Sequence, residues 1–203
     1  MNDILRYETA LYHSGYRAIA GTDEAGRGPL AGPVVAAAVI LYPGQFIADV
    51  TDSKKVPKHR REELFQRIMA EARGVAVGIC DHQEIDRINI LRASLEAMRR
   101  AVVSLPVTAD FVLIDGTFAI QLDLPQQTII KGDSLSLSIA AASIIAKVTR
   151  DRLMAEYDEL YPGYGFARHM GYPSVAHRDA LARLGPCPIH RRSFRLKAKV
   201  DSG

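Results

Sequence analysis

The chain has few of the features that mark disulfide-bonded, zinc-binding or membrane proteins. Only two cysteines occur among its 203 residues, Cys80 and Cys187, and neither belongs to a Cys-x-x-Cys or Cys/His cluster. We therefore expect neither a disulfide framework nor a zinc site. The longest apolar run, Val34 to Leu41, is much shorter than the roughly 20 residues that cross a bilayer, so no membrane association is predicted.

A secretion signal and a strong excess of charge are also missing. The N-terminal stretch MNDILRYETALYHSGYR lacks a basic-then-apolar layout, so we expect a cytoplasmic protein. The net charge of +3 is too small to indicate nucleic-acid binding by itself. Residues 190–200 are locally basic and contain no acid; they include Arg191, Arg192, Arg195, Lys197 and Lys199. This density suits phosphate groups, and a solvated tail is an equally good interpretation.

The composition is that of an ordinary globular protein. Hydrophobic residues make up 48% of the chain and charged residues 24%, which argues against a disordered or fibrous protein. We expect one domain over residues 1–203, in which residues 162–203 form a C-terminal extension of loop, short helix and basic tail. No internal repeat or low-complexity tract is present.

Apolar segments with strand character alternate with segments of helical period, which predicts an α/β fold. The expected strands are Arg17 to Thr22, Val34 to Leu41, Gly74 to Cys80, Phe111 to Asp115 and Gln127 to Lys131. Glycines and prolines between the first two strands favour a tight reversal, so the first three strands are predicted to form an antiparallel meander. A helix before the fourth strand allows a parallel crossover.

Four longer helices are predicted between and after these strands, over residues 60–73, 84–103, 135–160 and 174–184. In the second helix, apolar residues from Ile88 to Val102 recur at steps of three and four, as in one amphipathic helix. The third helix is rich in alanine, and its small side chains would let it lie close to the sheet. The glycine-rich and aromatic segment YPGYGFARHMGYP between the last two helices is predicted to be a loop.

Four acidic residues stand at the ends of predicted strands. Asp23 and Glu24 follow the first strand, Asp115 ends the fourth, and Asp133 follows the fifth. If the first and fourth strands are adjacent and parallel, Asp23 and Asp115 meet at the edge where open α/β sheets bind ligands. Asp133 would also suit the N-cap of the long helix, and Asp115 could form a turn with the glycine that follows it.

Several carboxylates held close together require a compensating cation. Magnesium prefers oxygen ligands, so a set of carboxylates without histidine or cysteine suits it better than zinc. Two such ions about 3.5–4 Å apart can activate water and stabilise the leaving oxygen at phosphorus. The acidic residues therefore point to phosphodiester hydrolysis.

Six motifs occur in an order that identifies a family. They are DEAGRGPLAGPV at 23–34, DSKK at 52–55, IDG at 114–116, KGD at 131–133, SIIAKVTRD at 143–151 and HRRSF at 190–194. With these motifs the chain resembles bacterial ribonuclease HII, the type 2 ribonuclease H family, over nearly its whole length. The resemblance implies a ribonuclease H-like fold with a mixed five-stranded sheet, flanking helices and a C-terminal helical extension.

The resemblance also implies an activity. Such enzymes hydrolyse RNA in RNA/DNA hybrids and cut on the 5′ side of a ribonucleotide embedded in duplex DNA, leaving a 3′-hydroxyl and a 5′-phosphate. The residues at the matching positions imply that Asp23, Glu24, Asp115 and Asp133 are catalytic and bind two Mn²⁺ or Mg²⁺ ions. By the family pattern, Asp23 bridges both ions, Glu24 and Asp115 lie on the leaving-group side, and Asp133 lies on the nucleophile side.

The same resemblance implies substrate contacts. Gly26, Arg27 and Gly28 would read the ribose 2′-hydroxyl, and Tyr172 would pack on the deoxyribose that follows the ribonucleotide. The expected phosphate contacts are Lys54, Lys55, Ser143, Lys147, Arg191 and Arg192. Met170 stands where many relatives carry lysine, which puts one phosphate contact in doubt. From the residues alone, the glycine loop could be an ordinary turn, Tyr172 a loop aromatic, and Ser143 and Lys147 polar positions of a helix.

Two further functions are compatible with parts of the pattern. One is another two-metal enzyme of the same fold acting on DNA, such as a resolvase or integrase, although DNA offers no 2′-hydroxyl for the glycine loop to read. The other is a non-catalytic nucleic-acid-binding module that uses the basic tail.

We expect a monomer whose partners are RNA/DNA hybrids and ribonucleotide-containing duplexes.

Overall fold

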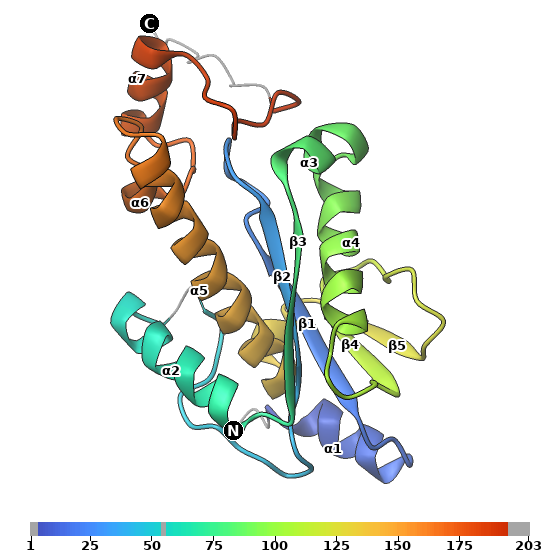
Figure 1. The fold of residues 1–203 in the computed structure, drawn as a ribbon. Helices are drawn as coiled ribbons and strands as arrows, with labels where there is room; N and C mark the ends of the chain where they lie inside the picture. Colours follow the sequence, from blue (N-terminus) through green and yellow to red (C-terminus); the bar gives the residue numbers. More distant parts are fainter. Residues whose placement is uncertain (1–3, 54–55, 195–203) are drawn as a thin grey trace, which may run out of the picture.

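The computed structural model describes residues 4–53 and 56–194 (Figure 1). The elements in chain order are α1 (Arg6–His13), β1 (Ile19–Ala25), β2 (Val34–Ile40), α2 (Lys58–Glu71), β3 (Gly74–Cys80), α3 (His82–Ile88), α4 (Ile90–Val103), β4 (Phe111–Asp115), β5 (Gln126–Ile129), the 3-10 turn η1 (Gly132–Ser134), α5 (Leu137–Leu160), α6 (Phe166–His169) and α7 (Val175–Leu184). The predicted loop at 161–173 therefore contains one short helix.

The strands form one mixed sheet in the order β3-β2-β1-β4-β5. β1 pairs antiparallel with β2, and β2 pairs antiparallel with β3, as the meander prediction requires. β4 lies parallel to β1, and β5 lies parallel to β4. The predicted α/β class and mixed five-stranded sheet are both confirmed.

Helices cover both faces of the sheet, α4 on one side and α5 with α2 on the other (Figure 1). β2, with the sequence VVAAAVI, is buried along its whole length because it lies inside the sheet between these two layers. Its alternate residues contribute to two cores: Ala36 and Ala38 pack toward α4, whereas Ala37 and Val39 pack toward α5. This arrangement explains why β2 reads as a continuous apolar run.

The long helix α5 lies against β1 with almost no side chain between them. A Cβ placed on Gly21 would clash with the backbone of Ser138 and Ile139. Small residues thus let the helix approach the sheet closely, as the alanine-rich sequence predicts. The buried side of the second half of α5 runs through Arg150 and Met154, whereas Leu160 is exposed.

The predicted single helix over residues 84–103 is wrong, because the chain forms two helices that meet at Asn89. Asn89 adopts φ +68°, a conformation that asparagine tolerates better than most residues. Its side chain accepts a hydrogen bond from the Arg92 amide and caps α4. Apolar periodicity continues through the break, which is why it suggests a single helix.

Two other boundaries differ from the prediction. β1 extends to Ala25, so Asp23 and Glu24 lie within the strand and pair with β2, rather than following the end of the strand. Helix α1 was not anticipated; its Glu8 carboxylate is buried and accepts hydrogen bonds from Ser136 and Ser138 at the start of α5. This contact joins the N-terminal segment to the helix that covers β1.

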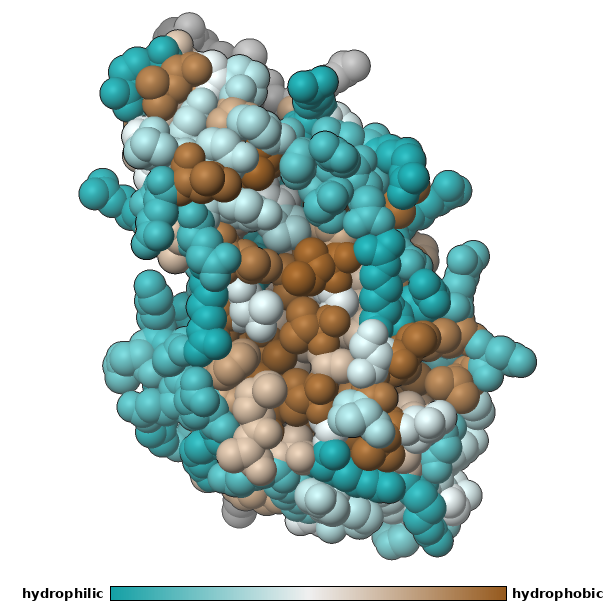
Figure 2. Space-filling model, in the orientation of Figure 1, coloured by the Kyte–Doolittle hydropathy of each residue, from teal (hydrophilic) through white to brown (hydrophobic). Residues whose placement is uncertain are grey.

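β3 is an edge strand of the sheet, and apolar residues gather over it. Figure 2 shows this apolar region between two hydrophilic flanks. Val75 and Val77 are partly buried and pack against the α5-side core, and Ile79 is 38% exposed. In the part of the chain that the structure describes, no helix is long and apolar enough to span a bilayer.

Candidate active site

The parallel pairing of β1 and β4 brings two acidic residues to one edge of the sheet. Thr22 pairs with Ile114, so the next residues, Asp23 and Asp115, lie at the same level of neighbouring strands. Their positions follow from the parallel register, as the sequence predicts. Glu24 lies beside Asp23 on the other face of the strand pleat, since successive side chains alternate.

Asp23 is buried in an environment that opposes its negative charge. Only 5% of the residue is exposed. Burial raises the pKa of Asp23 well above its usual value, and the nearby carboxylates of Glu24 and Asp115 raise it further. Two hydrogen bonds act in the opposite direction, one from the Ser143 hydroxyl and one from the Glu24 amide at 2.7 Å. A cation bound beside Asp23 would stabilise its ionised form.

Asp115 and Asp133 are linked through the turn that follows β5. The Gly132 amide donates to Asp115 Oδ1 at 2.6 Å, and Asp133 is the next residue, buried within η1. The N-cap of α5 is Ser136, whose side chain accepts from the Ile139 amide. The alternative role of Asp133 as cap of the long helix is therefore wrong.

A cleft opens beside these carboxylates, between β1, β4 and α4. It is lined by Glu24, Arg27, Leu95, Asp115 and Phe118, among others. Arg27 is half exposed, and its guanidinium lies 3.3 Å from the Glu24 carboxylate. Two predicted metal ligands, Glu24 and Asp115, and Arg27 of the glycine loop therefore line the same cleft.

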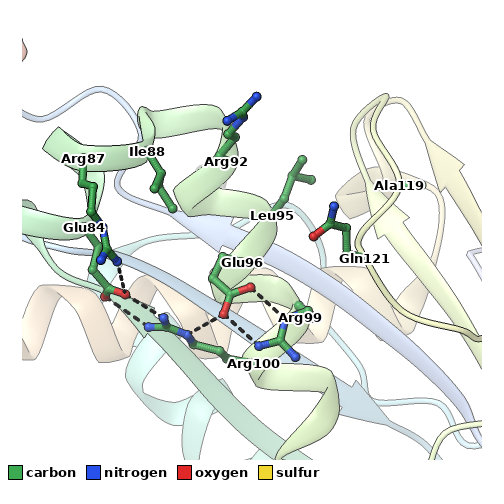
Figure 3. A pocket seen from close by; sticks show the side chains of 10 residues that line it. All are labelled: Glu84, Arg87, Ile88, Arg92, Leu95, Glu96, Arg99, Arg100, Ala119 and Gln121. Carbon is green, nitrogen blue, oxygen red and sulfur yellow. Dashed lines mark hydrogen bonds and ion pairs between the residues drawn. The ribbon is translucent and has the colours of Figure 1, made fainter.

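A larger pocket lies farther along α3 and α4 and has a different character (Figure 3). Its acidic and basic side chains pair with each other: Arg100 lies 2.6 Å from Glu84 and 2.9 Å from Glu96, and Arg99 lies 2.7 Å from Glu96. The pocket contains none of the four carboxylates discussed above. We therefore assign it no part in the chemistry.

The donor set fits hard divalent cations. Among residues 4–53 and 56–194, no group of three or more Asp, Glu, His or Cys side chains is arranged to hold a metal ion. Magnesium, however, is commonly bound by one or two carboxylates together with water and substrate phosphates. Burial and the neighbouring Glu24 and Asp115 carboxylates raise the pKa of Asp23. A bound cation would balance these negative charges.

The glycine loop and Tyr172, which are 144 positions apart in sequence, lie next to each other. A Cβ on Gly28 would lie 3.4 Å from the Tyr172 ring, and the Leu30 amide donates to the Gly171 carbonyl at 2.8 Å. Tyr172 is 44% exposed, so its ring is available to a ligand. The two elements predicted to contact sugar therefore form one surface.

A chain of hydrogen bonds through two histidines ends at the backbone carbonyl of Tyr172. The Cys187 amide donates to His190 Nδ1 at 2.9 Å, His190 Nε2 lies 3.1 Å from His177 Nε2, and His177 Nδ1 lies 2.9 Å from the Tyr172 carbonyl. These contacts require His190 to carry its proton on Nε2 and His177 on Nδ1. Both imidazoles are then neutral, and burial lowers the pKa of His177 to about 4.

The residues predicted to contact phosphate lie in different environments. Ser143 is buried and hydrogen-bonded to Ser53 at 2.8 Å as well as to Asp23, so it supports the carboxylate rather than facing solvent. Lys147 pairs with Asp151 at 2.6 Å. Lys54 and Lys55 lie outside the described residues, as do positions 195–203 of the basic tail.

Arg191 and Arg192, although adjacent, have opposite environments. Arg192 is exposed, and its amide donates to Asp86. Arg191 is only 3% exposed, and its guanidinium donates to backbone carbonyls of the loop at residues 26–33. The predicted phosphate contact by Arg191 is therefore wrong, because the side chain is enclosed by protein.

Sequence reasoning also missed Arg150, which is 1% exposed. A signal was present: Arg150 stands four residues after Ala146 and four before Met154, on the buried stripe of α5. A charged residue at such a position is unusual. Its guanidinium donates to three backbone carbonyls.

Comparison with known proteins gives consistent matches over almost the whole chain. A family model described as Ribonuclease HII matches residues 20–197. The chain is 61% identical over 189 residues to a ribonuclease HII of Geobacter sulfurreducens, covering 93% of this chain and 87% of that relative. It is similar in structure to ribonuclease H2 from Pyrococcus horikoshii, with TM-score 0.73 and 27% identity over 88% of this chain and 94% of that one. It also resembles a ribonuclease HII of Archaeoglobus fulgidus solved in complex with PCNA, with TM-score 0.73 and 26% identity over 90% and 97% of the two chains.

Proposed function

Because the chain belongs to the ribonuclease HII family, we propose that it is a metal-dependent endoribonuclease with two related activities. It hydrolyses RNA in RNA/DNA hybrids, and it cuts duplex DNA on the 5′ side of an embedded ribonucleotide, leaving a 3′-hydroxyl and a 5′-phosphate. The observation that supports this most is the buried Asp23 carboxylate beside Glu24 and Asp115, at an edge where a cation and a phosphate would balance the charge.

In this proposal Asp23, Glu24, Asp115 and Asp133 hold two Mg²⁺ or Mn²⁺ ions. When bound, such ions lower the pKa of an attacking water and stabilise the leaving oxygen. The protein's own contribution is to orient the oxygen ligands. The Glu24 amide and the Ser143 hydroxyl hold the Asp23 carboxylate, and the Gly132 amide holds Asp115.

Recognition of the ribonucleotide is assigned to the surface formed by Gly26, Arg27, Gly28 and Tyr172. Gly28 carries no side chain where the loop meets the Tyr172 ring, which leaves room for a sugar to approach the backbone. The 2′-hydroxyl both donates and accepts hydrogen bonds, and it distinguishes RNA from DNA at a given position. In this proposal the backbone amides of the loop donate to that hydroxyl.

The decisive experiment uses a DNA duplex that contains one ribonucleotide. Incubation with Mg²⁺ or Mn²⁺ should produce a single cut on the 5′ side of that residue, and EDTA should abolish it. The matched control is the same duplex with deoxyribose at that position, which should stay intact. A preparation that leaves the ribonucleotide-containing duplex uncut with either metal would contradict the proposal.

A further inference from the structure

Two buried arginines lie beneath the glycine loop and bind its backbone. Arg191 donates from Nη2 to the Gly26 carbonyl at 2.6 Å and from Nη1 to the Arg27 carbonyl at 3.1 Å. The same side chain also binds the carbonyls of Pro29, Gly32 and Pro33, at 2.8, 2.9 and 3.1 Å. One guanidinium thus binds five carbonyls within residues 26–33, from a position more than 150 residues away in sequence.

Arg150 extends this support to the segment that precedes Tyr172. Its guanidinium donates to the carbonyls of Pro33 at 3.0 Å, Ala31 at 3.2 Å and Met170 at 3.0 Å. A Cβ on Gly26 would lie 2.6 Å from Arg150 Cδ and closer still to its Nε. The glycine at position 26 is therefore required for the loop to rest on Arg150.

Backbone contacts place the C-terminal segment against the same loop. Ala31 forms a β-bridge with His190, the Arg191 amide donates to the Leu30 carbonyl at 2.8 Å, and the Gly32 amide donates to the Ile189 carbonyl at 2.9 Å. Figure 1 shows α6 and α7 at the end of the sheet where β1 and β2 are joined. Arg191 is therefore held to the loop both by its backbone amide and by its guanidinium.

Burying two cations is costly unless their hydrogen bonds are satisfied. All hydrogen bonds of these two guanidiniums among the described residues go to backbone carbonyls, and no ion pair within 4.0 Å joins either of them to a carboxylate there. Burial lowers the pKa of Arg150 to about 10 and that of Arg191 to about 9, the latter also because Arg150 is near. Apolar side chains in this space would leave the loop carbonyls without donors, so the two guanidiniums act as hydrogen-bond donors to the loop backbone.

The direction of the carbonyls fixes the direction of the amides. Peptide C=O and N–H groups point opposite ways in a trans peptide bond, and no cis peptide occurs in the described chain. Because the carbonyls of Gly26 and Arg27 point at Arg191, the amides of Arg27 and Gly28 point away from it. None of the hydrogen bonds among the described residues uses either amide.

We propose that Arg191, assisted by Arg150, is a positioning residue that holds the glycine loop with its Arg27 and Gly28 amides directed toward the ribose 2′-hydroxyl. This inference rests on the proposed function, because it assumes that the loop reads that group. Lysine cannot replace arginine here, since one ammonium cannot supply the forked donors that reach several carbonyls.

The test measures affinity for two duplexes in EDTA, where metal-dependent cutting cannot occur. One duplex contains a single ribonucleotide and the other is entirely DNA. A hydrogen bond to the 2′-hydroxyl should give the unmodified protein a preference of roughly 10-fold for the first duplex. Arg191→Lys should lose most of that preference while its affinity for the all-DNA duplex changes less than about twofold. Arg67→Lys, in an exposed pair with Glu71, is the matched control and should keep the preference.

The outcomes separate the two proposals. If Arg191→Lys weakens binding to both duplexes equally, or keeps the preference, the positioning role is overturned. Thermal unfolding of the same samples shows whether Arg191→Lys is folded. If it is not, Arg150→Lys replaces it, with the same loss of preference expected and an unchanged preference again overturning the role. A protein that does not cut the ribonucleotide-containing duplex with metal contradicts the proposed function as well. A protein that cuts it but shows no preference in EDTA overturns only the role of Arg191.

Discussion

Two glycines of one loop should respond in opposite ways to the addition of a single methyl group. Gly26 has φ +103°, and an added Cβ would overlap the Arg150 side chain and lie 2.8 Å from the Pro33 carbonyl oxygen. Gly28 has no positive φ, and an added Cβ would lie in ordinary contact, 3.4 Å from the Tyr172 ring. Gly26→Ala therefore tests the support of the loop, whereas Gly28→Ala tests the surface that faces the substrate.

The magnitude for Gly26→Ala follows from two costs. Overpacking a tight interior costs about 1–3 kcal/mol, and forcing a side chain into a left-handed conformation costs about 1–2 kcal/mol. The free energy of unfolding should therefore fall by about 2–5 kcal/mol. For a chain of this size, each kcal/mol lowers Tm by about 2–4 °C, so Tm should fall by roughly 4–20 °C.

Gly28→Ala should leave stability almost unchanged. Alanine restricts the unfolded chain, and where the native conformation accepts it the gain is about 0.4–1 kcal/mol. Its methyl group, however, fills the space between the loop and Tyr172. Displacing a substrate by about 1 Å can cost roughly 100-fold in rate, so cutting at a single ribonucleotide should fall by about 10–100-fold.

The assay pairs thermal unfolding with initial rates of cutting on the duplex that contains one ribonucleotide. The reasoning about the loop is refuted if Gly26→Ala keeps its Tm within about 2 °C of the unmodified protein. It is also refuted if Gly28→Ala cuts at the unmodified rate, because the methyl group would then lie away from the substrate. Both variants differ from the native protein by the same atoms, so each controls for the other.

Three other predictions concern the carboxylates, the tyrosine and the buried histidines. Asp23→Asn should lower the cutting rate by roughly 1,000-fold, about 4 kcal/mol of barrier, while duplex binding by gel shift persists; a variant that still cuts would favour a metal-independent function. Tyr172→Ala should impair cutting at a single ribonucleotide more than cutting of long RNA/DNA hybrids, and equal loss on both substrates would argue against a sugar contact. His177 has a pKa lowered from 6.5 to about 4, so its neutral form stabilises the fold above about pH 6.5 and that contribution is lost as pH falls toward 4. At about 1.4 kcal/mol per tenfold change in proton affinity, the loss is about 3 kcal/mol, and denaturation curves at several pH values should show a smaller loss for His177→Gln; an identical pH dependence would count against this assignment.

The layout of the sheet could be read from the sequence because its signals are local. The apolar run of β2 indicates a buried strand, and the helix before β4 allows the parallel pairing with β1 that the structure shows. The meeting of Asp23 and Asp115 follows from that register, since residues at the ends of adjacent parallel strands share one edge. Periodicity failed at Asn89, where a single left-handed residue breaks a helix without interrupting the apolar pattern.

The supporting contacts of the site were decided only by the tertiary structure. Charge patterning places Arg191 in a basic tail, yet the side chain is buried against carbonyls 158 to 165 positions earlier in the chain. Ser143 resembles a polar helix position, yet the close approach of α5 to β1 sets it against Asp23. Residue type and spacing determine which groups could carry the chemistry. Burial and long-range hydrogen bonds depend on how distant segments pack, and they decide which of those groups face a ligand and which hold the others in place.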